Sequence, residues 1–170
     1  MPQLVALSLS IGVLGGVATF LFLKWMTSYL IWAAFIAWAC YFHSGGNPEA
    51  LKKTIICNIF GAVCAWVAAL LLVTVAPPGA GSAAVVVGIT VFVLCLAAHL
   101  PALSTIPASV YGYASVFAFL LGNATTNLTK EALTSASPAN ALVAVTASMV
   151  VGALFGLASG KLGAALTKKA

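Results

Sequence analysis

The run LVALSLSIGVLGGVATFLFL, residues 4–23, carries no charged side chain and decides the class of fold. A helix needs about 20 mostly apolar residues to cross a bilayer, and this run meets that length. Further apolar runs follow at residues 26–42, 54–76, 83–100, 108–122 and 139–159. The sequence therefore predicts an all-α fold, a polytopic membrane helix bundle with about six transmembrane helices.

The composition of the whole chain agrees with this prediction. Of its 170 residues, 63% are hydrophobic and only 5% are charged, whereas about 25% of the residues in a soluble domain are charged. So few charges cannot cover the surface of a soluble fold, and the high hydrophobicity excludes a disordered chain. We expect residues 1–170 to form a single integral membrane domain.

The lysines flank the apolar runs and indicate the orientation. The side that holds both termini also holds most of them, namely Lys52, Lys53, Lys161, Lys168 and Lys169, while Lys24 and Lys130 fall on the other side. Because positive charge is concentrated in cytoplasmic segments, this bias predicts that both termini are cytoplasmic. The lysines form no basic stripe interleaved with aromatic residues, so the expected partner is the lipid bilayer and not a nucleic acid.

Two prolines separate the fourth and fifth runs. Pro101 and Pro107 prevent one continuous helix, which predicts a broken or re-entrant segment near 100–107. Backbone groups freed at membrane depth must face protein or water. Hydroxyl groups that could satisfy them are close by, on Ser104, Thr105, Ser109, Tyr111 and Tyr113. The segment is therefore either part of a solute pathway or a plain turn at the membrane interface.

Three further polar side chains are candidates for the same pathway. Asn58 lies one turn inside the third run, where its amide either bonds a neighbouring helix or lines a pore. His43 and His99 end the second and fourth runs on the same predicted side. Each histidine is either an interfacial anchor or part of a pore mouth.

Small residues recur four apart, the spacing that lets helix backbones approach closely in a membrane. The pattern includes Gly12 and Gly16 in the first run, Gly61 in the third, and Gly152, Gly156 and Gly160 in the sixth. These glycines either pack helices within one bundle or form a seam between identical subunits. The second reading predicts a homo-oligomer, and we also expect one because a lone bundle of 170 residues leaves little room for a wide pore.

Two segments also hint at an internal repeat. Gly61-Ala62-Val63 matches Gly152-Ala153-Leu154, in the third and sixth runs. Three spans are an odd number, so two such repeats, 4–76 and 83–159, would be inverted relative to each other in the membrane, as in many transporters.

The sequence lacks the arrangements of residues that metal binding or catalysis requires. Cys40, Cys57, Cys64 and Cys95 lack metal-ligand spacing, and no Ser–His–acid arrangement is available, so we expect no metal, no cofactor and no enzyme activity. The span cores also hold no acidic or basic side chain, whereas ion-driven transporters usually keep one there.

A passive route for a neutral solute fits this pattern best. We therefore expect a membrane channel or facilitator for a small uncharged polar solute, such as a urea-, ammonia- or glycerol-like molecule. The alternative is a non-transport membrane subunit that acts in assembly or protein interaction.

Three pieces of the chain, in order, resemble one known family. They are Ala39-Cys40-Tyr41-Phe42 followed by Gly45-Gly46, Pro107-x4-Gly112-x4-Phe117, and Gly152-Ala153-Leu154-Phe155-Gly156. They are similar to an uncharacterised family of small bacterial inner-membrane proteins. The resemblance implies a bacterial inner-membrane location and supplies no activity.

A second resemblance is partial. The sequence Leu100-Pro101 followed by Thr105-x-Pro107 is similar to the urea transporter signature Leu-Pro-x-x-Thr-x-Pro-Phe, with one extra residue and with Ala108 in place of Phe. Tyr111-Gly112-Tyr113 resembles another piece of that family in the opposite chain order. This likeness implies urea as one candidate solute.

Overall fold

The computed structural model describes residues 1–167, and within that range the fold is all-α, without a strand. The main helices are α1 (Gln3–Lys24), α2 (Ile31–His43), α3 (Pro48–Thr74), α4 (Ala80–Leu96), α5 (Ile106–Gly122) and α8 (Ala141–Leu166). Short helices α6 (Ala124–Asn127) and α7 (Lys130–Thr134) lie between α5 and α8. The prediction of an all-α helical bundle is confirmed. Lys168 and Lys169, used above to predict orientation, lie outside the described residues.

Four of the helices have the length and composition of membrane spans: α1, α3, α4 with its following turn, and α8. The other two apolar helices are shorter. Helix α2 has 13 residues, a rise of only about 20 Å. Its predicted start at residue 26 is wrong, because residues 26–30 are not helical and Leu30 is extended.

The irregular backbone before α2 is paired with another helix. The Leu30 amide donates to Ser148 Oγ on α8 at 2.9 Å. The first amide groups of a helix have no partner within the helix and need one from elsewhere in the protein. Hydropathy does not reveal this contact, and the apolar run 26–42 therefore predicts a longer helix than α2.

Helix α3 starts earlier than the third apolar run. Asn47 caps it, with Oδ1 accepting the Ala50 amide proton at 2.8 Å, and Pro48 occupies the first turn. Glu49 and Lys53 form an ion pair of 3.2 Å one turn apart. The first two turns are therefore a polar extension of the helix, which a search for apolar residues leaves out.

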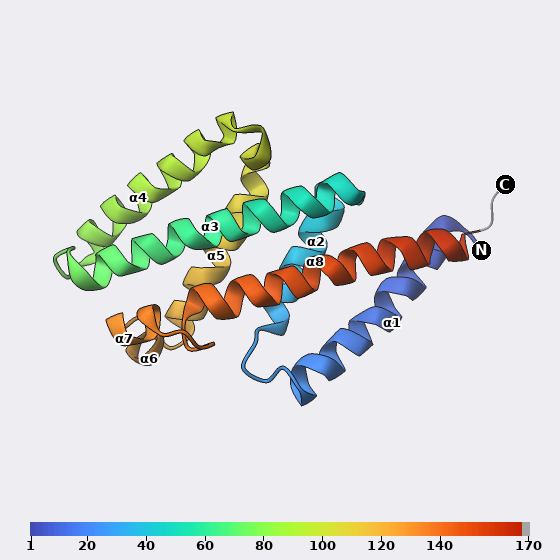
Figure 1. The fold of residues 1–170 in the computed structure, drawn as a ribbon, viewed down its shortest axis with the longest axis horizontal. Helices are drawn as coiled ribbons and strands as arrows, with labels where there is room; N and C mark the ends of the chain where they lie inside the picture. The colour runs from blue at the N-terminus through green and yellow to red at the C-terminus, as the bar shows by residue number, and fades with distance from the viewer. Residues whose placement is uncertain (168–170) are drawn as a thin grey trace.

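The six main helices form two groups that share α3 and α8 as a centre (Figure 1). Helix α8 packs against α1 and α2, α3 packs against α4 and α5, and α3 and α8 pack against each other. The amino group of Met1 donates to the Leu166 carbonyl at 3.3 Å, so both ends of the described chain lie at the same end of the bundle.

Glycines permit the closest contacts between these helices. A Cβ on Gly61 would overlap the Ser109 carbonyl, one on Gly112 would overlap the Asn58 carbonyl, and one on Gly152 would overlap the Ala34 carbonyl. Gly156 lies against the Tyr41 ring, and Gly160 lies near Tyr41 and Phe42. These glycines pack helices within one chain. Gly12 and Gly16 differ, since nothing lies within 4 Å of a Cβ placed on either.

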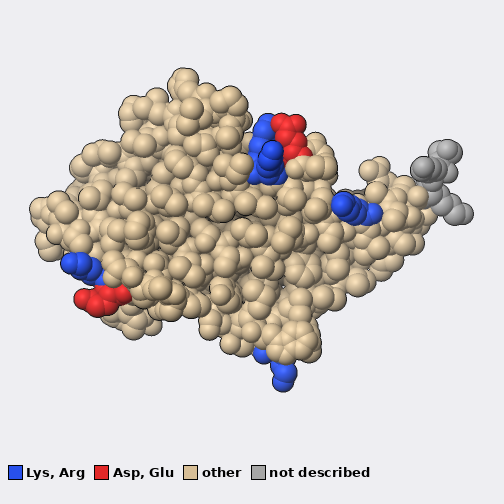
Figure 2. Space-filling model, in the orientation of Figure 1, with Lys and Arg blue, Asp and Glu red and all other residues tan. Residues whose placement is uncertain are grey.

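Charged side chains lie near the ends of the helices. Figure 2 shows a few separate charged spots on one face, with a broad uncharged surface between them. Glu49, Lys52 and Lys53 belong to the first turns of α3, and Lys130 and Glu131 belong to α7. This distribution leaves the middle of the bundle free of charge on the visible face.

Asn140 fixes the start of α8. Its Oδ1 accepts the Leu142 amide proton at 3.0 Å, while Nδ2 donates to the carbonyls of Leu133 (2.8 Å) and Ser135 (3.0 Å). The Leu133 carbonyl also accepts the Trp66 indole N–H at 2.8 Å. One side chain thus caps α8 and holds the preceding loop.

We expect Asn140→Ala to destabilise the protein by about 1–3 kcal/mol, because it removes the cap and the two hydrogen bonds to the Leu133 and Ser135 carbonyls. Asn140→Asp keeps the capping oxygen and loses only the donors, so it should cost less. Thermal unfolding of the detergent-solubilised protein measures both. Equal losses for the two variants would show that the cap contributes nothing.

Candidate functional site

A groove between α2 and α5 brings together several of the candidate residues. It has a volume of about 520 Å³, within the range of roughly 300–1,000 Å³ usual for small-molecule sites. Helix α2 contributes Trp32, Ile36, Ala39 and His43. Helix α5 contributes Tyr111, Ala114, Ser115 and Ala118. The walls are therefore mainly apolar, with three polar side chains among them.

His43 and Tyr111 form the polar end of this groove. His43 Nδ1 and the Tyr111 hydroxyl oxygen are 2.9 Å apart, a hydrogen bond whose donor depends on the histidine tautomer. His43 is the last residue of α2 and is exposed, and Tyr111 is half-buried in the second turn of α5. Both side chains therefore remain within reach of a solute.

Ser115 gives the groove a second polar point. It lies one helical turn beyond Tyr111 on α5 and is 1% exposed. Within residues 1–167, no hydrogen-bond partner exists for its hydroxyl. A buried polar group without a partner costs about 1–3 kcal/mol, so a solute that bonded to this hydroxyl would recover part of that cost.

Two more buried polar side chains without hydrogen-bond partners among the described residues lie where α3 and α5 cross. Asn58 and Ser109 are each 1% exposed. Neither atom of the Asn58 amide group nor the Ser109 hydroxyl has a partner among the described residues. The two helices touch here through Gly61 and Gly112. Both helices of this contact, the most closely packed one that α5 makes, therefore bury an uncharged side chain that is free to form hydrogen bonds.

The residues around the proline break lie apart from this region. Helix α4 ends at Leu96, and two 3₁₀ turns, Ala97–His99 and Pro101–Leu103, precede α5. The chain is therefore broken in the predicted segment, and Pro107 falls in the first turn of α5. The Cys57 thiol donates to the Ala102 carbonyl at 3.5 Å, which joins the break to α3.

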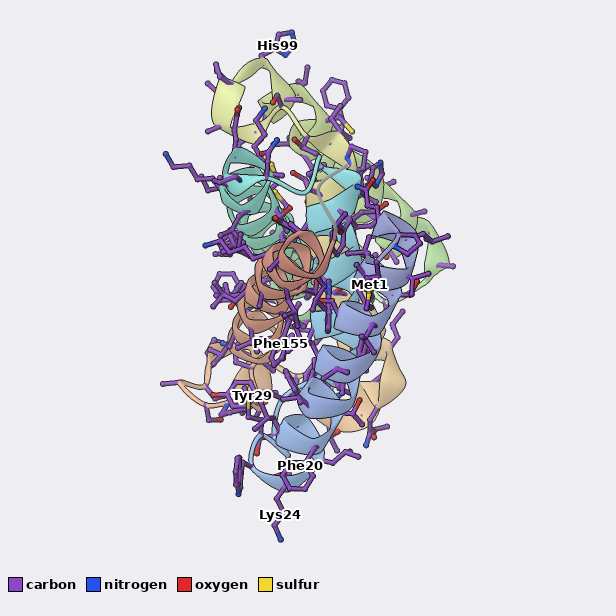
Figure 3. All side chains as sticks on the ribbon, turned by 90° about the vertical axis from the view of Figure 1, so that its right-hand side faces the viewer. Met1, Phe20, Lys24, Tyr29, His99 and Phe155 are labelled. Atoms are coloured by element: carbon purple, nitrogen blue, oxygen red, sulfur yellow. The ribbon has the colours of Figure 1, made fainter. Side chains whose placement is uncertain are left out.

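The polar side chains of the break bond locally. His99 Nδ1 pairs with the Leu96 carbonyl at 2.9 Å, and Ser104 Oγ donates to the Pro101 carbonyl at 3.0 Å. His99 lies at the outer edge of the molecule and points away from the other helices (Figure 3). Thr105 is half-buried directly before α5. None of these side chains lines the α2–α5 groove.

Tyr113 joins α5 to α4. Its hydroxyl lies 2.8 Å from Thr90 Oγ1, and the side chain is 7% exposed. The structure thus brings only His43 and Tyr111 of the predicted pathway residues together. Asn58 lies at the α3–α5 crossing, and the others lie elsewhere.

Sequence reasoning missed Ser115 and Trp32. Ser115 follows Tyr111 by four residues, a spacing that places both on one face of a helix. That spacing was a usable signal. Trp32 could be assigned to the groove only once the packing of α2 beside α5 was known.

A second cavity, of about 550 Å³, lies at the end of the bundle that holds the termini. It is formed by α1, α8 and the turn at Gly45 and Gly46, and its polar side chains are those of Gln3 and Thr167. None of the predicted pathway side chains reaches it. Across residues 1–167, no cluster of His, Cys, Asp and Glu is able to hold a metal ion.

These features define a class of protein, an all-α bundle of apolar helices compatible with a membrane location. The chain belongs to the family described as "Protein of unknown function (DUF1097)", whose model matches residues 8–164. The predicted resemblance to an uncharacterised family is thereby confirmed. No curated protein and no solved structure matches the chain. The likeness of 100–107 to the urea transporter signature stays a prediction.

Proposed function

We propose that the protein is a membrane channel or facilitator for a small uncharged polar solute. The observation that carries the proposal is the set of buried, unpartnered polar side chains Asn58, Ser109 and Ser115. They offer free hydrogen-bonding groups without charge inside a largely apolar bundle. A neutral polar molecule gains from such groups, and an ion would still lack a compensating charge.

The proposed setting is a bacterial inner membrane with both termini in the cytoplasm. Lys52, Lys53 and Lys161 lie toward the end of the bundle that holds the termini, whereas Lys24 and Lys130 lie toward the other. The excess of lysine at one end supports that end as the cytoplasmic one. No catalytic step, metal or cofactor is part of the proposal.

Flux into liposomes that contain the purified protein tests the proposal. Urea, glycerol and ammonia are offered separately, and empty liposomes give the background. We expect Asn58→Leu to lower the protein-dependent flux of the transported solute about tenfold, the effect of losing one hydrogen bond of about 1.4 kcal/mol in the limiting step. No flux above background for any of these solutes would count against the proposal.

Stability measurements separate transport from packing in the same variant. Asn58→Leu removes a buried amide that has no partner, so the variant should unfold at the same or a higher temperature than the unmodified protein. Met149→Leu on α8 is the matched control, because Met149 is equally buried and apolar. A stable Asn58→Leu variant with full flux would remove Asn58 from the pathway.

The second candidate is a non-transport membrane subunit. The observation in its favour is the exposed small-residue face of α1, where nothing packs on Gly12 or Gly16. Such a face suits close contact with another helix, either from a second copy of this chain or from a different subunit. A protein that conducts no solute and co-purifies as a stable assembly would favour this candidate.

A further inference from the structure

The two halves of the chain use corresponding positions for corresponding contacts. When Gly61 of α3 is aligned with Gly152 of α8, all but one of the buried residues of α3 fall on buried residues of α8. The aligned glycines also have equivalent partners. Gly61 meets the Ser109 carbonyl of α5, and Gly152 meets the Ala34 carbonyl of α2.

These two contacts align α2 with α5. With Ala34 set against Ser109, the starts of the two helices coincide at Ile31 and Ile106. Every buried residue of α2 then falls on a buried residue of α5. The same register matches Ala39 with Ala114 and Phe42 with Phe117. The agreement extends over the whole of α2.

The helices of each matched pair run in opposite directions along the bundle. Consecutive main helices alternate in direction, so α2 runs toward the end that holds the termini and α5 runs away from it (Figure 1). Helices α3 and α8 also run in opposite directions, and so do α1 and α4. Helix α1 packs on α8, and α4 packs on α3. Opposite directions in all three pairs are the arrangement that a two-fold rotation about an axis across the bundle would produce.

Most of the residues that line the groove between α2 and α5 lie at positions that this rotation exchanges. Ile36 corresponds to Tyr111, Ala39 to Ala114, and His43 to Ala118, and all six residues line the groove. The axis therefore passes through the groove, about midway along α2 and α5. In transporters built from inverted repeats, substrate sites lie at the repeat interface near the middle of the bilayer.

Polarity breaks the symmetry within the groove. His43 and Tyr111 are hydrogen-bonded at one end, while their counterparts at the other end, Ala118 and Ile36, are apolar. Ser115, with its unpartnered hydroxyl, corresponds to Cys40. Trp32 adds a flat apolar wall. The lining offers two hydrogen-bonding points and an apolar surface, without a charged acid or lysine.

We infer that the two halves are inverted repeats and that the groove on their axis binds a neutral solute with a hydrogen-bonding head and an apolar flank. This inference rests on the proposed function and names the site and the solute class. The head bonds to Tyr111, His43 or Ser115, and the flank lies along Trp32 and the alanines.

Cysteine labelling in proteoliposomes tests the site. Ala39→Cys and Ala114→Cys place thiols on opposite walls of the groove, and Val110→Cys places one on the exposed face of α5 outside it. N-ethylmaleimide is the reagent, and the chain with only its native cysteines is the blank. We expect both groove thiols to react faster than the thiol at position 110, because only the groove gives a solute access. Equal rates would overturn the site.

Benzamide and benzoate then probe the solute class, since they have nearly the same shape and differ in charge. Benzamide should slow labelling of the two groove thiols and leave the control thiol unaffected, and benzoate should protect none of them. Tyr111→Phe should weaken the protection about three- to tenfold, the value of one hydrogen bond. Equal protection by benzoate would overturn the neutral-solute assignment.

An exchange of the polar pair across the axis tests the repeat itself. His43→Ala with Tyr111→Ile should abolish protection by benzamide. Adding Ala118→His and Ile36→Tyr rebuilds the pair at the other end, and protection should return. A folded exchange variant without protection would overturn the two-fold relation and leave the groove in place. Protection of the groove thiols by benzamide without solute flux in liposomes would contradict the proposed function and leave the binding site in place. Flux without protection would show that the solute passes through another part of the protein.

Discussion

Gly61→Leu and Gly152→Leu should each prevent the protein from reaching its folded state. At both positions a side chain would occupy the space of a backbone carbonyl on the neighbouring helix, Ser109 in one case and Ala34 in the other. Backbone cannot rotate away as a side chain does, so α3 and α5, or α8 and α2, would have to separate. We expect a loss of at least about 3 kcal/mol, the upper end of the usual cost of overpacking.

Size-exclusion chromatography of the detergent-solubilised variants, together with thermal unfolding, measures this effect. Gly12→Leu and Gly16→Leu are the matched controls, because they make the same change at glycines with open space around them. They should keep the thermal stability of the unmodified protein. If the α1 face associates with another copy, these controls will also lower the mass of the detergent complex without unfolding it. Folded Gly61→Leu or Gly152→Leu protein would contradict the helix crossing.

Tyr41→Ala should have the next largest effect. Tyr41 is 2% exposed, its ring packs against Gly156, and its hydroxyl donates to the Gly46 carbonyl at 2.7 Å. Removing the ring leaves a cavity between α2 and α8, which for a buried aromatic side chain costs about 3–5 kcal/mol. The variant should therefore unfold at a much lower temperature.

Tyr41→Phe separates the ring from the hydroxyl. It keeps the packing on Gly156 and loses only the bond to Gly46, which lies in the turn after α2 with a φ of +64°. The expected cost is about 1 kcal/mol. Thermal unfolding of the two variants side by side gives the comparison, and a Phe variant as unstable as the Ala variant would show that the hydroxyl, not the ring, holds α2 against α8.

Hydropathy was sufficient to predict the class of fold and the approximate place of each main helix, because long apolar runs without charge have few alternatives in a membrane protein. It misplaced the helix starts that depend on polar contacts. The Leu30 amide bonds to Ser148, and Asn47 caps α3 well before its apolar run begins. Both boundaries are set by hydrogen bonds that an apolar periodicity does not record.

The candidate site was predictable only in part. The sequence marks Asn58 as a polar side chain inside an apolar run, His43 as a histidine at the end of one, and Tyr111 as a hydroxyl near the proline break. Their grouping was not visible, since His43 and Tyr111 are 68 residues apart and meet only because α2 and α5 lie side by side. Closeness to two prolines marks Ser104 and Thr105 as candidates for the same pathway, and His99, which directly precedes this break, is marked by its place at the end of the fourth run. That closeness in sequence places them at the end of the bundle, away from the groove.

The modest length of the two helices that enclose the groove has a consequence for the surrounding lipid. Helix α2 has 13 residues and α5 has 17, rises of about 20 and 26 Å, against a hydrocarbon layer of about 30 Å. In a bilayer, the irregular residues 26–30 before α2 would fill part of the remaining thickness, and the mismatch left over would draw the two leaflets toward each other beside α2 and α5. The hydrocarbon layer would then be thinnest beside α2 and α5. A solute that crossed there would pass through the shortest length of hydrocarbon.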